Sequence, residues 1–182
     1  MVSDAQAGTL GESLFTAYCI WSTAGNLESY RPVSDDDHRD FAVHARDGFG
    51  TAYVQVKTAT HPVEGRVFAR AMYPVDHVLE APGFLYAILL VGADAEGNVA
   101  ILTSWLVPSA DFNRLAFHER TSHSPSHVQL VFEAHADPQH QDAWSRFRTP
   151  PLELGRRLLA LLPELPKQAA RIPQALLLLS PR

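Results

Sequence analysis

Two apolar segments joined by a polar turn, FLYAILLVGADAEGNVAILTSWLV over residues 84–107, constrain the fold more than any other feature of this chain. The Asp, Gly and Asn residues between the segments are typical of a turn, so the two segments are predicted to form a β-hairpin. Apolar residues run on through both segments, which indicates strands that are buried on both faces. We therefore predict that this hairpin lies at the centre of the core.

The N-terminal part of the chain predicts a helix followed by strands. Apolar residues recur at helical spacing between Thr9 and Ala24, and Gly25 stands where a C-terminal cap is expected. A strand is predicted around residues 27–33. The segments DFAVHAR (40–46) and TAYVQVKT (51–58) alternate polar and apolar residues around the turn DGFG, so they predict an antiparallel hairpin.

A strand is predicted near residues 67–73, within a segment that could form a flap. A short helix over 111–118, a strand over 127–135 and closing helices around Trp144 and over 151–162 follow. Prolines at 163, 166 and 173 prevent one continuous C-terminal helix. Residues 1–182 are predicted to form a single domain with a helical region from about residue 138.

Composition and charge exclude several functional classes. A net charge of −5 argues against a broad basic surface for nucleic acid, so any such contact must be local. The densest basic group, Arg146, Arg148, Arg156 and Arg157, is also explained by the solvated faces of two late helices. Cys19 is the only cysteine, which excludes an internal disulfide and fits a reducing compartment. No secretory signal or membrane span is evident, so the cytoplasm is the expected location.

Three polar positions on neighbouring predicted elements indicate a site. Gln55 and Lys57 share one face of their strand, because side chains alternate along it. Asp40 begins the partner strand of the hairpin and so lies near the end of the second strand. Carboxylate and amide oxygens suit Mg²⁺, which keeps several waters and takes phosphate oxygens from substrates. Lys57 would then stabilise developing negative charge.

With Glu12 on the first helix, this order of residues resembles the PD-(D/E)XK nuclease superfamily: GTLGESLF, DDDHRDFAV and YVQVKT carry the likeness. The resemblance implies an α/β, restriction-endonuclease-like fold, with a mixed central β-sheet, an N-terminal helix on one side and C-terminal helices. It implies Asp40 as the principal ligand of Mg²⁺ or Mn²⁺, Gln55 and Glu12 as accessory ligands, and Lys57 as the electrostatic catalyst. DNA is favoured over RNA as the substrate, and a homodimer is compatible with it.

Two departures from that family pattern stand out. Gln55 replaces the more common acidic residue, which removes a negative charge from the metal site, and no proline precedes Asp40. Most of the polar residues in this region also fit a structural role. Thr9 and Glu12 have the spacing of a capping box. Asp35, Asp36 and Asp37 suit a solvated loop, although Asp37 could replace Asp40. Asp40 could cap the start of its strand, and Lys57 could be a charge that protects an edge strand from aggregation. His44 could be a proton shuttle or a half-exposed strand residue.

The histidines do not predict a zinc site. His118 and His123 are five positions apart rather than the four that a helical metalloprotease motif needs, and Pro125 interrupts the spacing from His123 to His127. The polar residues 12, 40, 55 and 57 together predict a metal-dependent nuclease.

One alternative is an inactive member of the same fold that binds nucleic acid or protein, for example in a defence or toxin–antitoxin-type system. Another is a structural partner protein that docks through the apolar ALLLLS near its end.

Overall fold

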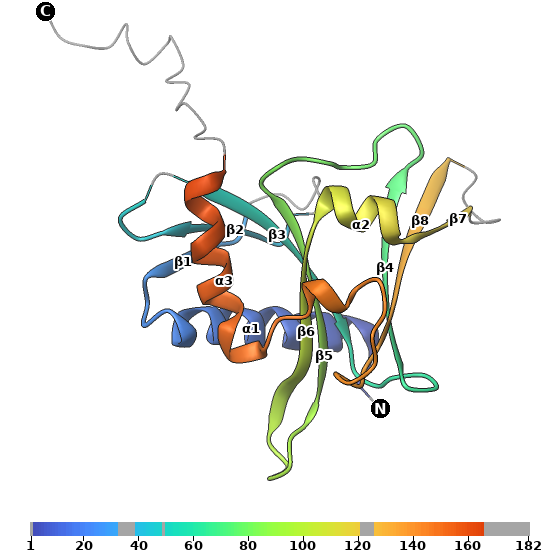
Figure 1. Ribbon diagram of the computed structural model, residues 1–182, viewed down its shortest axis with the longest axis horizontal. Coiled ribbons are helices and arrows are strands. Elements are labelled where there is room, and N and C mark those ends of the chain that lie inside the picture. Colours follow the sequence, from blue (N-terminus) through green and yellow to red (C-terminus); the bar gives the residue numbers. More distant parts are fainter. Residues whose placement is uncertain (1, 33–38, 49, 121–125, 166–182) are drawn as a thin grey trace, which may run out of the picture.

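The computed structural model describes residues 2–32, 39–48, 50–120 and 126–165 (Figure 1). The helices and strands are, in chain order, α1 (Asp4–Ser22), β1 (Leu27–Tyr30), β2 (Phe41–Ala45), β3 (Thr51–Ala59), β4 (Arg66–Pro74), β5 (Phe84–Ala93), β6 (Val99–Pro108), α2 (Ser109–Leu115), β7 (Phe117–Arg120), β8 (His127–His135) and α3 (Leu154–Leu161). Short 3-10 turns span Ser145–Phe147, Pro151–Glu153 and Leu162–Glu164. Within these described residues, no helix is long and apolar enough to cross a membrane.

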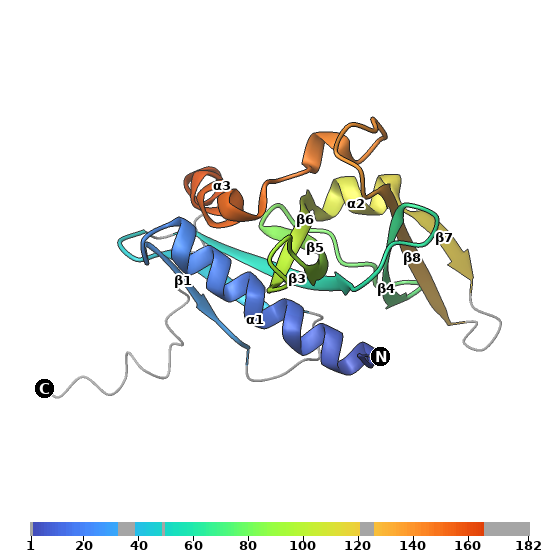
Figure 2. The same cartoon turned by 90° about the horizontal axis from the view of Figure 1, so that it is seen from below.

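The strands form two sheets. The larger has the order β1-β2-β3-β5-β6, and the smaller has the order β4-β8-β7. Strands β3 and β5 run parallel, whereas every other pair within the two sheets is antiparallel. The larger sheet is therefore mixed. Figure 2 shows α3 on one side of the molecule and the smaller sheet on the other, with β3, β5 and β6 between them.

Strand β5 is buried on both faces, as the sequence predicts. Leu85, Ala87 and Leu89 belong to a cluster formed with α1 and α3. Tyr86 and Ile88, between them in sequence, belong to a second cluster formed with β4, β8 and α2. Alternation along the strand therefore places one half of its side chains in each of two cores. The prediction of the hairpin with β6 is confirmed by the β5–β6 pairing.

Helix α1 begins earlier than the sequence pattern suggests. Ser3 is the N-cap, and its side chain and that of Gln6 form a capping box. Thr9 lies inside the helix, where its hydroxyl donates to the Ala5 carbonyl at 3.1 Å. The predicted Thr9–Glu12 capping box is therefore wrong, because a Ser-x-x-Gln motif six residues upstream starts the helix. At the other end, Gly25 adopts a φ of 78° after the helix, as expected.

Strand β7 is the element that the sequence does not predict. The helix expected over 111–118 is observed as α2, which ends at Leu115. The chain turns extended at Ala116, and Phe117–Arg120 pairs with β8 at the edge of the smaller sheet. Short edge strands carry little apolar periodicity, so pairing rather than pattern decides this segment. The helix expected around Trp144 is only a 3-10 turn, and ALLLLS lies outside the described residues.

Cys19 lies in the core, as predicted. Its side chain is buried in the cluster under α1 and α3. Burial raises the pKa of the thiol from 9.0 to about 12. The thiol therefore stays protonated at neutral pH, which makes it a poor nucleophile.

A glycine lets α1 approach β3. A Cβ atom on Gly11 would lie 1.9 Å from Oγ1 of Thr58 and 2.9 Å from its Cβ. Gly155 on α3 has a similar role, since its Cβ would lie 2.5 Å from the Cys19 carbonyl oxygen of α1. These contacts place α1 against the strand that carries Gln55 and Lys57.

We expect Gly11→Ala to lower the free energy of unfolding by about 1–3 kcal/mol, because the new methyl group must displace Thr58. Gly8→Ala is the matched control, since nothing lies within 4 Å of the added Cβ. The control should be neutral or stabilising by up to about 1 kcal/mol, from helix propensity. Urea unfolding measures both values, and equal effects of the two substitutions would contradict the close approach of α1 to β3.

Candidate functional site

Asp40 stands directly before β2 and is fixed against β3. The register pairs Phe41 with Val54. The Val56 backbone N–H donates to Oδ2 of Asp40 at 2.6 Å. The carboxylate therefore lies at the backbone between Gln55 and Lys57, where the hairpin geometry predicts it.

Gln55 is buried on the opposite face of β3 from Val54 and Val56. Its side chain is only 3% exposed, whereas the two valines pack in the cluster under α1. The Tyr73 hydroxyl, from β4, donates to Oε1 of Gln55 at 3.1 Å. Tyr86, from β5, shares a 2.5 Å hydrogen bond with Tyr73. A chain of three polar groups thus runs through an otherwise apolar cluster.

Both tyrosines are held in the neutral form. Burial raises the pKa of Tyr73, the hydrogen bond from Tyr86 lowers it, and the negative charge of Asp40 raises it. Burial also raises the pKa of Tyr86, with a further contribution from Tyr73. The phenols therefore remain hydrogen-bond donors at neutral pH.

Lys57 is half-buried and lines a surface cleft of about 400 Å³. His61 and Arg70 lie in the same cleft, and Asp4 of α1 lines it too. Lys57 is two residues beyond Gln55 on the same face of β3, so the cleft lies further along this strand from Gln55. Positively charged side chains in such a cleft suit a phosphate-bearing ligand.

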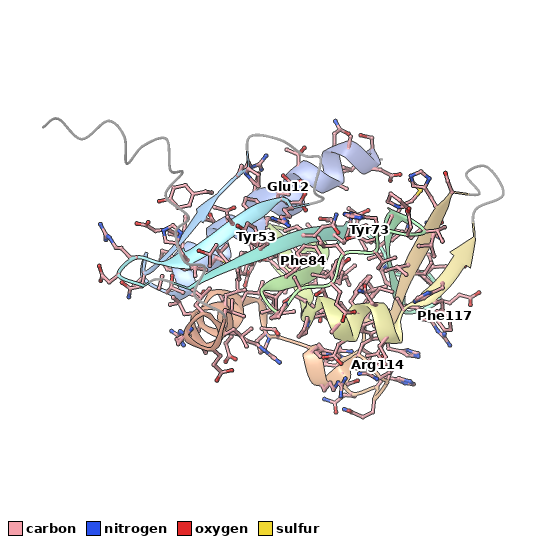
Figure 3. The ribbon with its side chains drawn as sticks, turned by 90° about the horizontal axis from the view of Figure 1, so that it is seen from above. Glu12, Tyr53, Tyr73, Phe84, Arg114 and Phe117 are labelled. Carbon is pink, nitrogen blue, oxygen red and sulfur yellow. The ribbon has the colours of Figure 1, made fainter. Side chains whose placement is uncertain are left out.

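Glu12 is committed to an ion pair. Its Oε2 atom lies 2.8 Å from Nη2 of Arg31, and the Glu12 side chain is 25% exposed. The Arg31 guanidinium also lies 5.4 Å from the ring centroid of Phe41, the residue after Asp40. The charge of Glu12 is thus balanced by Arg31, and Phe41 belongs to the cluster on the opposite face of β3 from Gln55, so these contacts do not bring Glu12 to Gln55. Figure 3 shows Glu12 on α1, with Tyr53 and Tyr73 on the strands.

The oxygen atoms of Asp40 and Gln55 suit a hard cation that keeps much of its water shell better than a cation enclosed by protein ligands. Asp40 offers a carboxylate, and the Gln55 oxygen keeps a second lone pair beside the one that Tyr73 uses. Across the described ranges, no group of three His, Cys, Asp or Glu residues could hold a metal ion. Mg²⁺ accommodates such a site, because it takes its remaining ligands from water and substrate phosphate.

The remaining predicted candidates take structural roles or lie outside the described residues. His44 lies 3.2 Å from a Glu28 carboxylate oxygen and stacks on Tyr30, an arrangement that favours the strand-residue interpretation. His118 lies in β7 rather than in a helix. Asp35, Asp36, Asp37 and His123 lie outside the described residues.

The C-terminal arginines mostly bind the protein itself. Arg156 donates to the Ser22 carbonyl at 2.9 Å, which ties α3 to the end of α1. Arg148 donates to the carbonyls of His135 and Ala136, and Arg157 donates to the Thr149 hydroxyl. Arg146 pairs with Asp111 at 2.7 Å. These contacts favour a structural role over a nucleic-acid surface.

Tyr73 and Tyr86 are site residues that the sequence reasoning missed. A signal existed for Tyr73, since alternation in VFARAMY places it on the same face as the buried Val67, Ala69 and Ala71. Nothing in the sequence indicates that this face covers Gln55. That contact arises because β4 does not join the larger sheet but pairs with β8 in the smaller one.

Comparison with known proteins identifies the fold. The structure matches that of a bacterial homing endonuclease, I-Ssp6803I, with a TM-score of 0.54 and 13% sequence identity, over 90% of this chain and 96% of that chain. The fold is restriction-endonuclease-like, with α1 packed on a central mixed sheet and α3 near the C-terminal end. No protein-family model matches the sequence, and no curated protein does.

We expect Tyr73→Phe to lower the free energy of unfolding by about 1–3 kcal/mol, because Gln55 and the Tyr86 hydroxyl both lose a buried partner. Tyr86→Phe is the control, since it leaves the bond from Tyr73 to Gln55 intact. Its cost should be smaller, about 1 kcal/mol. If urea unfolding gives equal losses, the bond to Gln55 contributes nothing to stability.

Proposed function

We propose that this protein is a PD-(D/E)XK nuclease that hydrolyses phosphodiester bonds of nucleic acid, with DNA as the favoured substrate. The observation that carries the proposal is the hydrogen bond from the Val56 N–H to Asp40, which supports a site formed by this carboxylate with the flanking residues Gln55 and Lys57. The restriction-endonuclease-like fold, shared with a homing endonuclease, supports the same conclusion. Residues 1–182 are taken as one nuclease-like domain, because β5 contributes to both core clusters.

Asp40 and Gln55 would hold Mg²⁺ or Mn²⁺ through a carboxylate and an amide oxygen. When bound, such an ion acidifies water and offsets charge on a phosphoryl group. Tyr73 fixes the rotamer of Gln55, so the amide oxygen is held in place before a ligand arrives. Glu12 would serve as an accessory ligand only if it gave up its ion pair with Arg31.

A homodimer and a cytoplasmic location stay predictions.

Lys57 supplies the positive charge of the reaction site. Its position two residues beyond Gln55 on the same strand face, and its place in the cleft, support this role. There it stabilises the negative charge that develops on the non-bridging phosphate oxygens.

We expect Lys57→Ala to lower the cleavage rate by about 10²–10³-fold in Mn²⁺, the usual effect of removing one electrostatic stabiliser. Lys167→Ala is the matched control, because it makes the same charge change at the only other lysine of the chain. Plasmid and RNA cleavage measure both, with melting temperature as a check of folding. A wild type that cuts neither substrate would remove the catalytic proposal, and an active Lys57→Ala would remove the role of Lys57.

We expect Gln55→Glu to tighten Mn²⁺ binding by roughly ten-fold, because a full charge replaces a dipole next to the ion. The same charge should lower the melting temperature in EDTA, since it is buried near Asp40. Calorimetric titration and melting of wild type and variant test both effects. Unchanged affinity together with unchanged melting would show that Gln55 and Asp40 do not face one ion.

A non-catalytic binding module of the same fold is the second candidate. It is favoured by the charges of the site, where Gln55 is neutral and Glu12 is balanced by Arg31. Nucleic-acid binding by a wild type that Mn²⁺ does not activate would support this candidate. A defence or toxin–antitoxin-type system is one setting for such a module.

A further inference from the structure

A small pocket lies beside the proposed metal site. It has a volume of about 170 Å³, and its aromatic and apolar walls come from different elements. Tyr53 of β3 and Phe84 of β5 form one part, which Figure 3 shows with both residues labelled. Leu79 and Pro82, from the connection between β4 and β5, and Leu165 complete the apolar lining. The Arg39 guanidinium provides a charged wall and lies 4.5 Å from the Tyr53 ring centroid.

The pocket and the site are built from the same two strand segments. Arg39 directly precedes Asp40, and Tyr53 is two residues before Gln55 on the same face of β3. Two residues of extended strand span roughly 6.6–6.8 Å. A group bound at Asp40 and Gln55 therefore lies about two strand residues from Tyr53 in the pocket wall, and Lys57 lies two residues further along β3.

The lining selects the chemical class of the occupant. A volume of about 170 Å³ is several times that of one water, so the pocket has room for a flat heteroaromatic ring. Aromatic faces and guanidinium planes are the surfaces on which proteins stack unpaired bases. Two backbone N–H groups of the lining are already paired, since the Tyr53 N–H donates to the Gly83 carbonyl at 2.7 Å and the Phe84 N–H donates to the Ala81 carbonyl at 3.0 Å. Stacking, rather than hydrogen bonding to those groups, would hold the ring.

We infer that this pocket receives an unpaired nucleobase from a nucleotide adjoining the phosphate at the Asp40 and Lys57 site. The inference rests on the proposed function and adds a property to it. A base can enter the pocket only after it leaves the stack, so the protein acts on single-stranded nucleic acid or extrudes a nucleotide from a duplex. Tyr53 is then a binding residue for the base, distinct from the groups that hold the phosphate.

The test compares two labelled probes of equal length, a thymidine homopolymer and an abasic deoxyribose-phosphate chain. Binding of each is measured by fluorescence anisotropy in Ca²⁺, and the probes are checked afterwards for cleavage. Tyr53→Leu removes the aromatic face but keeps an apolar side chain, and Tyr53→Phe keeps the face. Tyr30→Leu is the matched control, because Tyr30 aligns with Tyr53 across Ala42 on the same sheet face and is 53% exposed.

The wild type should bind the thymidine probe more tightly than the abasic one, by about 5- to 150-fold, the range for stacking on one aromatic side chain. Tyr53→Leu should abolish this preference, whereas Tyr53→Phe and Tyr30→Leu should keep it. A wild type without the preference, or a preference that survives Tyr53→Leu, overturns the inference. If such a wild type still cuts plasmid, the proposed nuclease function is kept and only the inference about the pocket is lost. If it neither binds nor cuts, both are lost.

Discussion

The burial of β5 on every side determines where the other elements lie. Strand β3 pairs with one edge of β5 and β6 with the other. The cluster under α1 and α3 covers one face, and the smaller sheet covers the other. Because β3 and β5 are parallel, the chain must cross over between them, and parallel strands cannot be joined by a tight turn. Strand β4 belongs to that crossover, and it brings Tyr73 onto Gln55.

The tyrosine pair gives a physical reason for an amide at position 55. A carboxylate there would be buried among phenols whose own pKa values are raised by burial, and close to Asp40. Both influences would favour its protonated form. Glutamine accepts the Tyr73 hydrogen bond without adding a negative charge near Asp40. Negative charge for a divalent ion would then come partly from the substrate phosphate, which couples ion binding to substrate binding.

The sequence predicts what depends on local pattern. Alternation and turn chemistry identify the β2–β3 hairpin and the β5–β6 hairpin, and they place Asp40 beside Gln55. It does not predict which elements meet across the fold. The ion pair of Glu12 with Arg31, the contact of Tyr73 with Gln55 and the edge pairing of β7 all join segments whose spacing carries no periodic signal. The roles of Glu12, Asp40, Gln55 and Lys57 in catalysis remain predictions.

The distribution of positive charge explains how an acidic chain could bind nucleic acid. With a net charge of −5, the protein gains little from long-range attraction to phosphates. The late arginines donate to carbonyl and hydroxyl groups of the protein, so their donors are partly occupied by the fold. Lys57 and Arg70 line the cleft, and Arg39, the residue before Asp40, lines the pocket. Binding affinity for nucleic acid would therefore come mainly from contacts at the reaction site. Base stacking there would compensate for the weak long-range electrostatic attraction.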